Sequence, residues 1–349
     1  MIARRSFPLA LLLLALGAGA QQLPKVRKQK QEKEPPTQTL PLEKEPPAAV
    51  TVETARLTFH VSPLSDKGLL SQQTRDAMKS LLDANRGAPI VKLRAFVAGT
   101  GDLRRVQAIV SEMFSDKKMP LPALTTIQVG GLPMEGAQVV IESLSSDKRA
   151  VNPNGLAFFP ARRAADAAGA IAQLGSAAEA SHVAASEVLQ VTCFLSSLEA
   201  VSAGRTAAAS AFPGAATDFV ENQRLSTDRS AQCEAVGRRG SAGKTEITPE
   251  AVLVSEPKLV MSGAQMAFRE EDSDLKLAFD RLEKSLRGMN ANSADVVYAR
   301  FYPLTRTVQE KLAALRMQVF PQAAASLVRA EGLPSVDASM AVEVIALGK

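Results

Sequence analysis

Apolar positions along the chain follow strand and helix periods in an order that predicts a small α/β unit. Apolar and polar residues alternate over 52–61, which predicts a strand with one buried face. Residues 69–85 and 102–114 carry apolar side chains at helical spacing, and Asp102 is a suitable N-cap for the second helix. Short apolar runs between and after these helices predict further strands. The predicted order of elements is therefore strand, helix, strand, helix, strand, strand.

The same landmarks recur three times in the same order. In each copy a β-like run containing a phenylalanine precedes a helix that ends in a second phenylalanine, 18, 18 and 19 residues later. A proline and two short strands follow, and the last strand carries one glutamate among apolar residues. These glutamates are Glu142, Glu234 and Glu343. The repeat predicts three tandem units: unit 1 over 51–146, unit 2 over 147–240 and unit 3 over 245–349.

Each unit is expected to be a two-layer α+β sandwich, because helices with one apolar face must pack on a sheet. The other face of the sheet would be bare in a lone unit, and a bare apolar face needs a partner. Three copies on one chain can cover each other. Unit 2 is the most eroded copy, with an opening strand predicted only over 156–159 and an alanine-rich first helix over 164–185.

The first 50 residues are not expected to belong to the repeat. Residues 1–20 combine Arg4 and Arg5 with a short apolar run and small residues, which predicts a secretory signal and therefore export; an uncleaved anchor is the alternative. Residues 21–50 are rich in Lys, Glu, Gln and Pro and predict a disordered linker. No later apolar run is long enough to span a bilayer, so no stable membrane insertion is expected after cleavage.

Composition narrows the classes of function. The net charge of +5 includes two signal arginines, and the chain has no Trp and 4% aromatic residues, so a nucleic-acid partner is not expected. His60 and His182 fall in different units, and we predict no metal site and no cofactor. Export permits a disulfide between Cys193 and Cys233, with two free core thiols as the open alternative.

Several segments together resemble one known family. They are PALTTIQVGGLP (122–133), FPGAATDFVENQRL and CEAVGR in unit 2, and KLVMSGAQM (258–266) and SLVRAEGLP (326–334) in unit 3. They resemble the RidA family of reactive-intermediate imine/enamine deaminases, also called YjgF or endoribonuclease L-PSP. The resemblance implies a RidA-like, chorismate-mutase-like fold. Because the family forms homotrimers, it also implies a monomeric chain that acts as a covalent pseudo-trimer.

The resemblance implies sites between neighbouring units. In the family an arginine grips the substrate carboxylate and a last-strand glutamate holds the attacking water, a role that Glu142, Glu234 and Glu343 would inherit. No unit keeps the arginine. Its place is taken by Leu124 in unit 1, by Ala215 or Ala216 in unit 2, and by Ala323 or Ala325 in unit 3. Further implied ligand-binding positions are Ser262 and Gln265, with Arg329 as a candidate replacement cation.

Three functional hypotheses remain open at the level of sequence. The first is a small-molecule-binding or catalytically altered protein, which the missing arginine favours. The second is an imine or enamine deaminase that uses the last-strand glutamates, and the third is a structural or partner-binding protein. A glutamate in such a strand can also be solvated at a rim or bonded to backbone. Convergence of the glutamates with Arg, Ser or Tyr between units would support the first two hypotheses.

Overall fold

The computed structural model describes residues 44–99, 101–224, 226 and 229–349. The predicted signal over 1–20 and nearly all of the predicted linker lie outside the described residues. From residue 44 onward the chain belongs to one compact unit. Within the described ranges, no helix is both long and apolar enough to cross a membrane.

Unit 1 has the predicted order of elements. Its sheet runs β2-β5-β3-β4, in which β3 and β4 are parallel and the other pairs antiparallel. Helix α2 begins after Asp102, whose side chain accepts a hydrogen bond from the backbone N–H of Arg104 as the predicted N-cap. The elements are β2 (Leu57–Val61), α1 (Leu70–Ala84), β3 (Ile90–Ala98), α2 (Leu103–Asp116), β4 (Ala123–Val129) and β5 (Val139–Ser146).

Unit 2 repeats the same sheet order as β6-β9-β7-β8. The prediction for its opening strand was wrong, because β6 continues past Phe159 to Ala164 with a shift of register between Phe159 and Arg162. Pro160 has no N–H to give to the ladder, so the strand bulges there instead of ending. The elements are β6 (Leu156–Ala164), α3 (Ala167–Ala180), β7 (Val188–Leu195), α4 (Val201–Ala211), β8 (Ala216–Glu221) and β9 (Ala231–Arg238).

Unit 3 shows the order a third time as β12-β16-β14-β15, with β13 continuing the line of β12 along β16. The α+β class and the three tandem sandwiches are therefore confirmed. The elements are β12 (Lys258–Ser262), β13 (Gln265–Phe268), α5 (Asp272–Arg287), β14 (Val296–Pro303), α6 (Arg306–Val319), β15 (Ala324–Leu327) and β16 (Ala338–Leu347). Short 3-10 turns η1 (Thr54–Arg56), η2 (Ala185–Glu187) and η3 (Ser293–Asp295) precede β2, β7 and β14.

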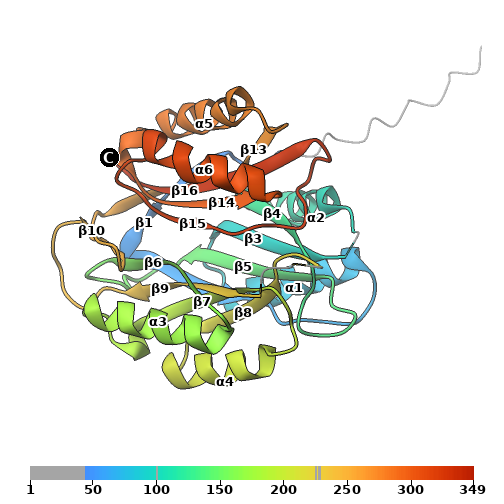
Figure 1. The fold of residues 1–349 in the computed structure, drawn as a ribbon, viewed down its shortest axis with the longest axis horizontal. Helices are drawn as coiled ribbons and strands as arrows, with labels where there is room; N and C mark the ends of the chain where they lie inside the picture. Colours follow the sequence, from blue (N-terminus) through green and yellow to red (C-terminus); the bar gives the residue numbers. More distant parts are fainter. Residues whose placement is uncertain (1–43, 100, 225, 227–228) are drawn as a thin grey trace, which may run out of the picture. The chain divides into compact units, whose positions relative to one another are not determined.

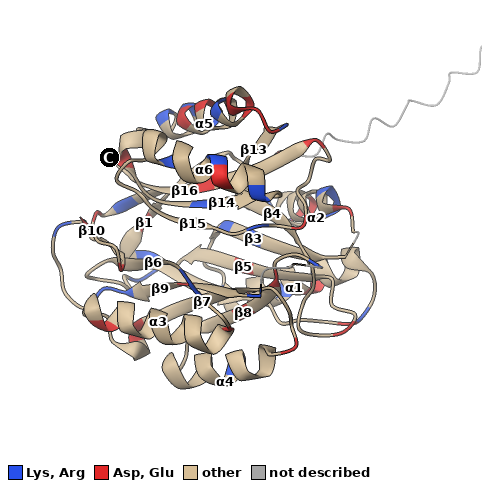
Figure 2. Ribbon diagram, viewed as in Figure 1, with Lys and Arg blue, Asp and Glu red and all other residues tan. Residues whose placement is uncertain are grey.

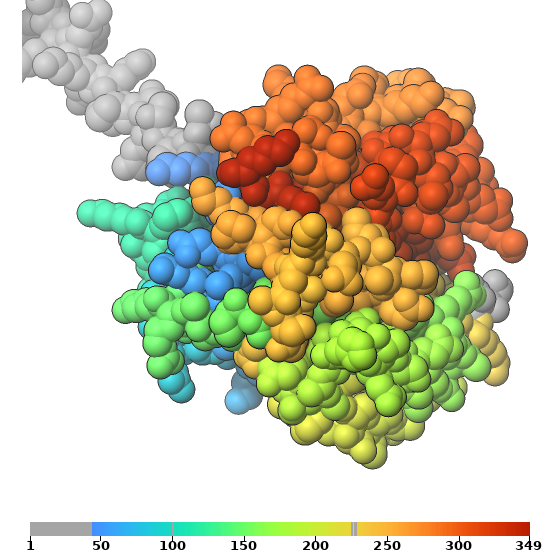
Figure 3. Space-filling model, turned by 90° about the vertical axis from the view of Figure 1, so that its left-hand side faces the viewer, coloured from blue at the N-terminus to red at the C-terminus, as the bar shows by residue number. Residues whose placement is uncertain are grey.

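Two strands pair with a unit other than the one they precede in the chain. Strand β1 (Ala49–Glu53) leads into unit 1 but pairs with β12 of unit 3, and it begins inside the range predicted as linker. Strand β11 (Val252–Val254), paired with β10 (Glu246–Ile247), leads into unit 3 but pairs with β6 of unit 2. In Figure 3 this amber segment lies between the green and the orange-red parts of the chain. These exchanges hydrogen-bond unit 1 to unit 3 and unit 3 to unit 2, and they cover the otherwise unpaired edges of β12 and β6.

The helices lie outside the three sheets, and the sheet faces turned away from the helices meet inside (Figure 1). Each unit buries its own core beneath its helices. Two further apolar clusters are shared among the units, one containing Phe96, Phe194 and Tyr302 and the other Phe59, Phe158 and Tyr298. The expectation that the units cover each other's bare sheet faces is therefore confirmed.

Cys193 and Cys233 form a disulfide, which settles the alternative that the sequence left open. The two residues face each other across β7 and β9, and both are fully buried. The bridge closes a loop with a sequence separation of 40 residues, so it restricts the unfolded chain.

Breaking this bridge should lower the free energy of unfolding by about 2–4 kcal/mol. Chemical denaturation of Cys193→Ala/Cys233→Ala measures the loss directly. The exposed pair Ser202→Ala/Ser210→Ala on α4 is the control, and equal stability of the bridged and bridge-less proteins would contradict the prediction.

Candidate functional site

The three predicted glutamates meet in the interior of the protein. Glu142 lies on β5, Glu234 on β9 and Glu343 on β16, and each is 2% exposed or less. They stand opposite Arg94, Thr192 and Arg300 on the neighbouring strands. Because side chains alternate along a strand, these positions face away from the helices and toward the other units.

Arg94 joins all three units. Its Nε donates to Glu142 of its own unit, and its Nη1 donates to Glu234 of unit 2 at 2.7 Å and to the Tyr302 hydroxyl of unit 3 at 3.1 Å. Its Nη2 donates to Thr192 Oγ1 at 3.1 Å. One guanidinium therefore uses its fork of donors to tie together residues from three sheets.

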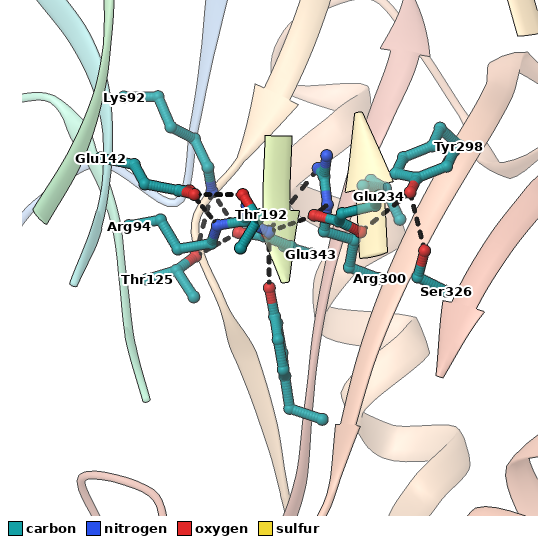
Figure 4. Close-up of polar contacts among 12 residues, drawn as sticks. Lys92, Arg94, Thr125, Glu142, Thr192, Glu234, Tyr298, Arg300, Ser326 and Glu343 are labelled. Carbon is teal, nitrogen blue, oxygen red and sulfur yellow. Dashed lines mark hydrogen bonds and ion pairs between the residues drawn. The ribbon is translucent and has the colours of Figure 1, made fainter. Parts of the chain in front are cut away.

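Lys92 and Arg300 complete the ion pairs. Lys92 Nζ donates to Glu343 at 2.5 Å and to Thr125 Oγ1 at 3.0 Å, and Arg300 Nε donates to Glu234 at 2.7 Å. Figure 4 shows these side chains converging from strands of different units. We call the set the central ionic layer; its members are Lys92, Arg94, Glu142, Asp218, Glu234, Arg300 and Glu343.

Charges in the layer determine its protonation. Burial alone would raise the pKa of Glu343, but Lys92, Arg94 and Arg300 hold that pKa at about 2. The pKa of Glu234 is lowered in the same way, because Arg300 and Arg94 outweigh the effect of burial. Burial raises the pKa of Asp218 well above its usual range, and the adjacent Glu142 raises it further. The surrounding cations therefore favour the ionised forms of Glu234 and Glu343, whereas burial favours the protonated form of Asp218.

The space beside the layer is small. A cavity of about 30 Å³ is lined on one side by charged residues of the layer and on the other by apolar residues such as Phe59, Phe158 and Met261. This volume corresponds to about one water molecule. The geometry therefore pairs each of the three glutamates with a buried cation and leaves room for about one water molecule beside them.

The predicted ligand-binding positions separate into two groups. Ser262 is fully buried, its Oγ accepts from the backbone N–H of Val344, and its carbonyl accepts from Lys92, so it joins the layer. Leu124 is 6% exposed and lies at the boundary with unit 3, where its carbonyl accepts from the Ala264 N–H at 3.3 Å. A side chain on Gly263 would come within 2.8 Å of that same carbonyl, so the two segments are in close contact.

Two other predicted positions lie at the ends of strands in unit 3. Gln265 opens β13 opposite Val342, and Arg329 follows the end of β15 at Leu327. Because β15 ends between Ala325 and Arg329, the two residues do not share a regular strand. Parallel pairing places Leu124, Thr217 and Ala325 at equivalent positions, so the residue of unit 2 that corresponds to Leu124 is Thr217, not Ala215 or Ala216.

The sequence reasoning missed the cations of the layer and the two tyrosines, Tyr298 and Tyr302, that hydrogen-bond to it. Lys92 and Arg94 interrupt an apolar run at alternate positions, and Tyr298 and Arg300 do the same in unit 3. Charged residues at alternate positions of a strand buried on both faces require partners. That signal could have identified a buried ionic cluster, although not its partners.

Comparisons with known proteins yield structural matches only. No protein-family model matches the chain, and no curated protein matches its sequence. A YjgF/YER057c/UK114 family member from Mycobacterium tuberculosis is 22% identical, with 26% of this chain and 78% of that chain covered and a TM-score of 0.24. A Rid family protein of unknown function from Yersinia pestis is 14% identical, with 26% and 80% covered and a TM-score of 0.24.

A YjgF family protein from Neisseria meningitidis is 14% identical, with 28% of this chain and 84% of that chain covered and a TM-score of 0.22. Each match thus covers about a quarter of the chain and most of the matched protein. The matched structures carry the names of the family that the sequence motifs resemble.

Proposed function

We propose that this chain is an exported, RidA-like pseudo-trimer that binds a small molecule and does not hydrolyse imines. The observation that carries the proposal is the environment of the three glutamates, which are buried and paired with cations next to a cavity of about 30 Å³. A catalytic glutamate must reach its substrate directly or through one water. Here the glutamates bind the three units together instead.

A groove between units 1 and 3 is the proposed ligand site. Its volume is about 640 Å³, within the range of small-molecule sites. Apolar side chains from both units line it, including Leu103, Met266, Phe268 and Leu333, and Asp102, Arg104, Gln107 and Gln128 add charged and polar groups. This lining suits a mainly apolar molecule with one or two hydrogen-bonding groups.

Export is supported by two independent features. The first is the signal-like pattern of residues 1–20, and the second is the Cys193–Cys233 disulfide. Disulfides persist in oxidising compartments and are rare in the cytosol. We propose that the mature chain works outside the cytoplasm as a single-chain monomer.

The alternative of a deaminase rests on one observation. The glutamates converge with Arg94, Tyr298 and Ser326, which is the arrangement that the sequence-based hypothesis required. Mature protein incubated with freshly generated 2-iminopropanoate should nevertheless release no ammonia above the spontaneous rate, with an active RidA enzyme as the positive control. Release at the rate of that enzyme, lost in Glu343→Gln, would replace the proposal with the deaminase.

Binding in the groove should depend on Phe268, which is 40% exposed there. The variant Phe268→Asp should weaken the binding of an apolar fluorescent probe, 8-anilinonaphthalene-1-sulfonate, by at least about tenfold, which corresponds to about 1.4 kcal/mol. Leu277→Asp, at an exposed site on α5 outside the groove, is the matched control. Equal probe affinity in both variants would show that the probe binds elsewhere.

A further inference from the structure

More cations than carboxylates line the small cavity beside the central ionic layer. Lys92, Arg94 and Arg300 reach it from β3 and β14. The carboxylates among its lining residues are Glu142 and Glu343. Each of these two already accepts hydrogen bonds from one of the cations and from a hydroxyl group. The polar side of the cavity therefore carries an excess of positive charge.

Hydrogen-bond donors at the cavity lack acceptors. Gln190 lines it from β7 and is 4% exposed, and its Nε2 is buried without a hydrogen-bond partner among the described residues. The Arg300 Nε donates to Glu234 at 2.7 Å, whereas its Nη1 lies 3.8 Å from Glu343, too far for a hydrogen bond. A buried donor without an acceptor is costly. The cavity should therefore hold a group that accepts hydrogen bonds.

All three units contribute donors to this cavity. By strand pairing, Gln190 of unit 2 stands at the position that Lys92 holds in unit 1 and Tyr298 in unit 3. The opposite wall is apolar and includes Phe59 and Phe158. Because such a wall excludes bulk water, the local dielectric is low, and a charge held by the donors interacts with them strongly.

Size and charge identify the kind of ligand. We propose that the cavity binds one small inorganic anion, a halide such as chloride, among Lys92, Arg300 and Gln190. A volume of about 30 Å³ admits a single halide ion, which is only slightly larger than a water molecule, and it is too small for phosphate or sulfate. A halide ion accepts hydrogen bonds from an ammonium, a guanidinium and an amide together. Unlike water, it brings no donors of its own that would need further acceptors.

Binding of the anion should be coupled to the uptake of a proton. The layer has three cations and four carboxyl groups, and burial together with Glu142 raises the pKa of Asp218 and so favours its protonated form. With that proton the layer is neutral, so an added anion favours one further proton on the Asp218–Glu142 pair. Burial lowers the pKa of Lys92, and an adjacent anion raises it again. The anion should therefore bind more tightly as the pH falls.

The other titratable groups around the cavity do not oppose this dependence. Neighbouring cations lower the pKa of Glu234 and hold that of Glu343 at about 2, so both stay ionised at pH 5.5 and above. Burial raises the pKa of Tyr298 and of Tyr302, so both phenols stay neutral. The arginines of the layer stay charged.

Thermal unfolding of the mature protein, followed by circular dichroism, tests the proposal. At pH 5.5, replacing sodium gluconate with NaCl or NaBr at constant ionic strength should raise Tm saturably by at least about 2 °C, because a bound halide stabilises the fold and gluconate is too large for the cavity. The rise should be smaller at pH 8.5.

Gln190→Glu provides the matched test, because its tethered carboxylate takes the place of the anion. This variant should show no halide response. Gln322→Glu adds the same charge at an exposed site and should keep the response of the unmodified protein. If Gln190→Glu does not fold, Gln190→Met serves instead, because it removes the amide donor and retains much of the volume, and its halide response should be weaker.

Identical Tm values in the three sodium salts at both pH values would overturn the proposal. A halide response of the unmodified size in Gln190→Glu, or in Gln190→Met, would place the anion elsewhere and also overturn it. Neither result bears on ammonia release or probe binding, so the proposed function is tested separately.

Discussion

Replacing Arg94 with methionine should lower the free energy of unfolding by about 3–5 kcal/mol, the largest effect that we expect from one side chain. The change leaves Glu142 and Glu234 buried with fewer compensating charges, and it removes the hydrogen bonds to Thr192 and Tyr302. Methionine retains much of the volume, so the loss reports charge and hydrogen bonding more than packing. Chemical denaturation followed by circular dichroism measures the difference.

Arg104→Met is the matched control for this prediction. Arg104 also forms an ion pair, with Asp102, but both side chains are largely exposed at the start of α2. Exposed pairs contribute about 0–1 kcal/mol, so this variant should be close to the unmodified protein. If the two variants lose equal stability, the central ionic layer is not what joins the units.

Lowering the pH should destabilise the protein because it protonates glutamates of the central ionic layer, above all Glu343. Its pKa is held at about 2 in the fold, against 4.5 for an unperturbed glutamate. The folded state thus favours the ionised form, and the stabilisation is fully present above about pH 4.5. It is lost as the pH falls toward 2, because the unfolded chain binds the proton more tightly. The difference corresponds to about 3 kcal/mol at neutral pH.

Glu234 acts in the same direction and Asp218 in the opposite one. The lowered pKa of Glu234 adds to the loss of stability in acid. The raised pKa of Asp218 gives a stabilisation that is present in acid and is lost as the pH rises through its folded pKa. The rise in stability between pH 2 and 4.5 should therefore be steep, and the opposing effect of Asp218 should begin only above its unperturbed pKa of 3.8.

Denaturation of Glu343→Gln from pH 2 to 7 measures the contribution of this residue. The variant should be less stable than the unmodified protein at pH 7, and the difference should narrow toward pH 2. Glu310→Gln, at an exposed site on α6, is the control and should follow the unmodified protein. A constant difference between Glu343→Gln and the unmodified protein at every pH would show that the lost stability is not linked to ionisation.

The surface helices of the three units differ in how many charged residues they carry. Figure 2 shows many charged positions on α5 and α6 and few on α3 and α4. The sequence of unit 2 shows the same erosion, and its layer positions Gln190 and Thr192 are neutral where unit 1 has Lys92 and Arg94. Unit 2 nevertheless keeps its sheet order, because apolar burial and the disulfide maintain it.

The sequence by itself determined the local features of this protein. Periodicity within each segment specified the three units, the Asp102 N-cap and the alternating strand that brings Glu343 to an inward face, because these depend on neighbours a few residues away. Three further features were decided only by the tertiary structure. Strand β1 pairs with unit 3, Thr217 occupies the strand position that corresponds to Leu124, and Glu142 and Glu234 both bond to Arg94. These depend on how three sheets close around a shared interior, where contacts join residues about 50 to 250 positions apart.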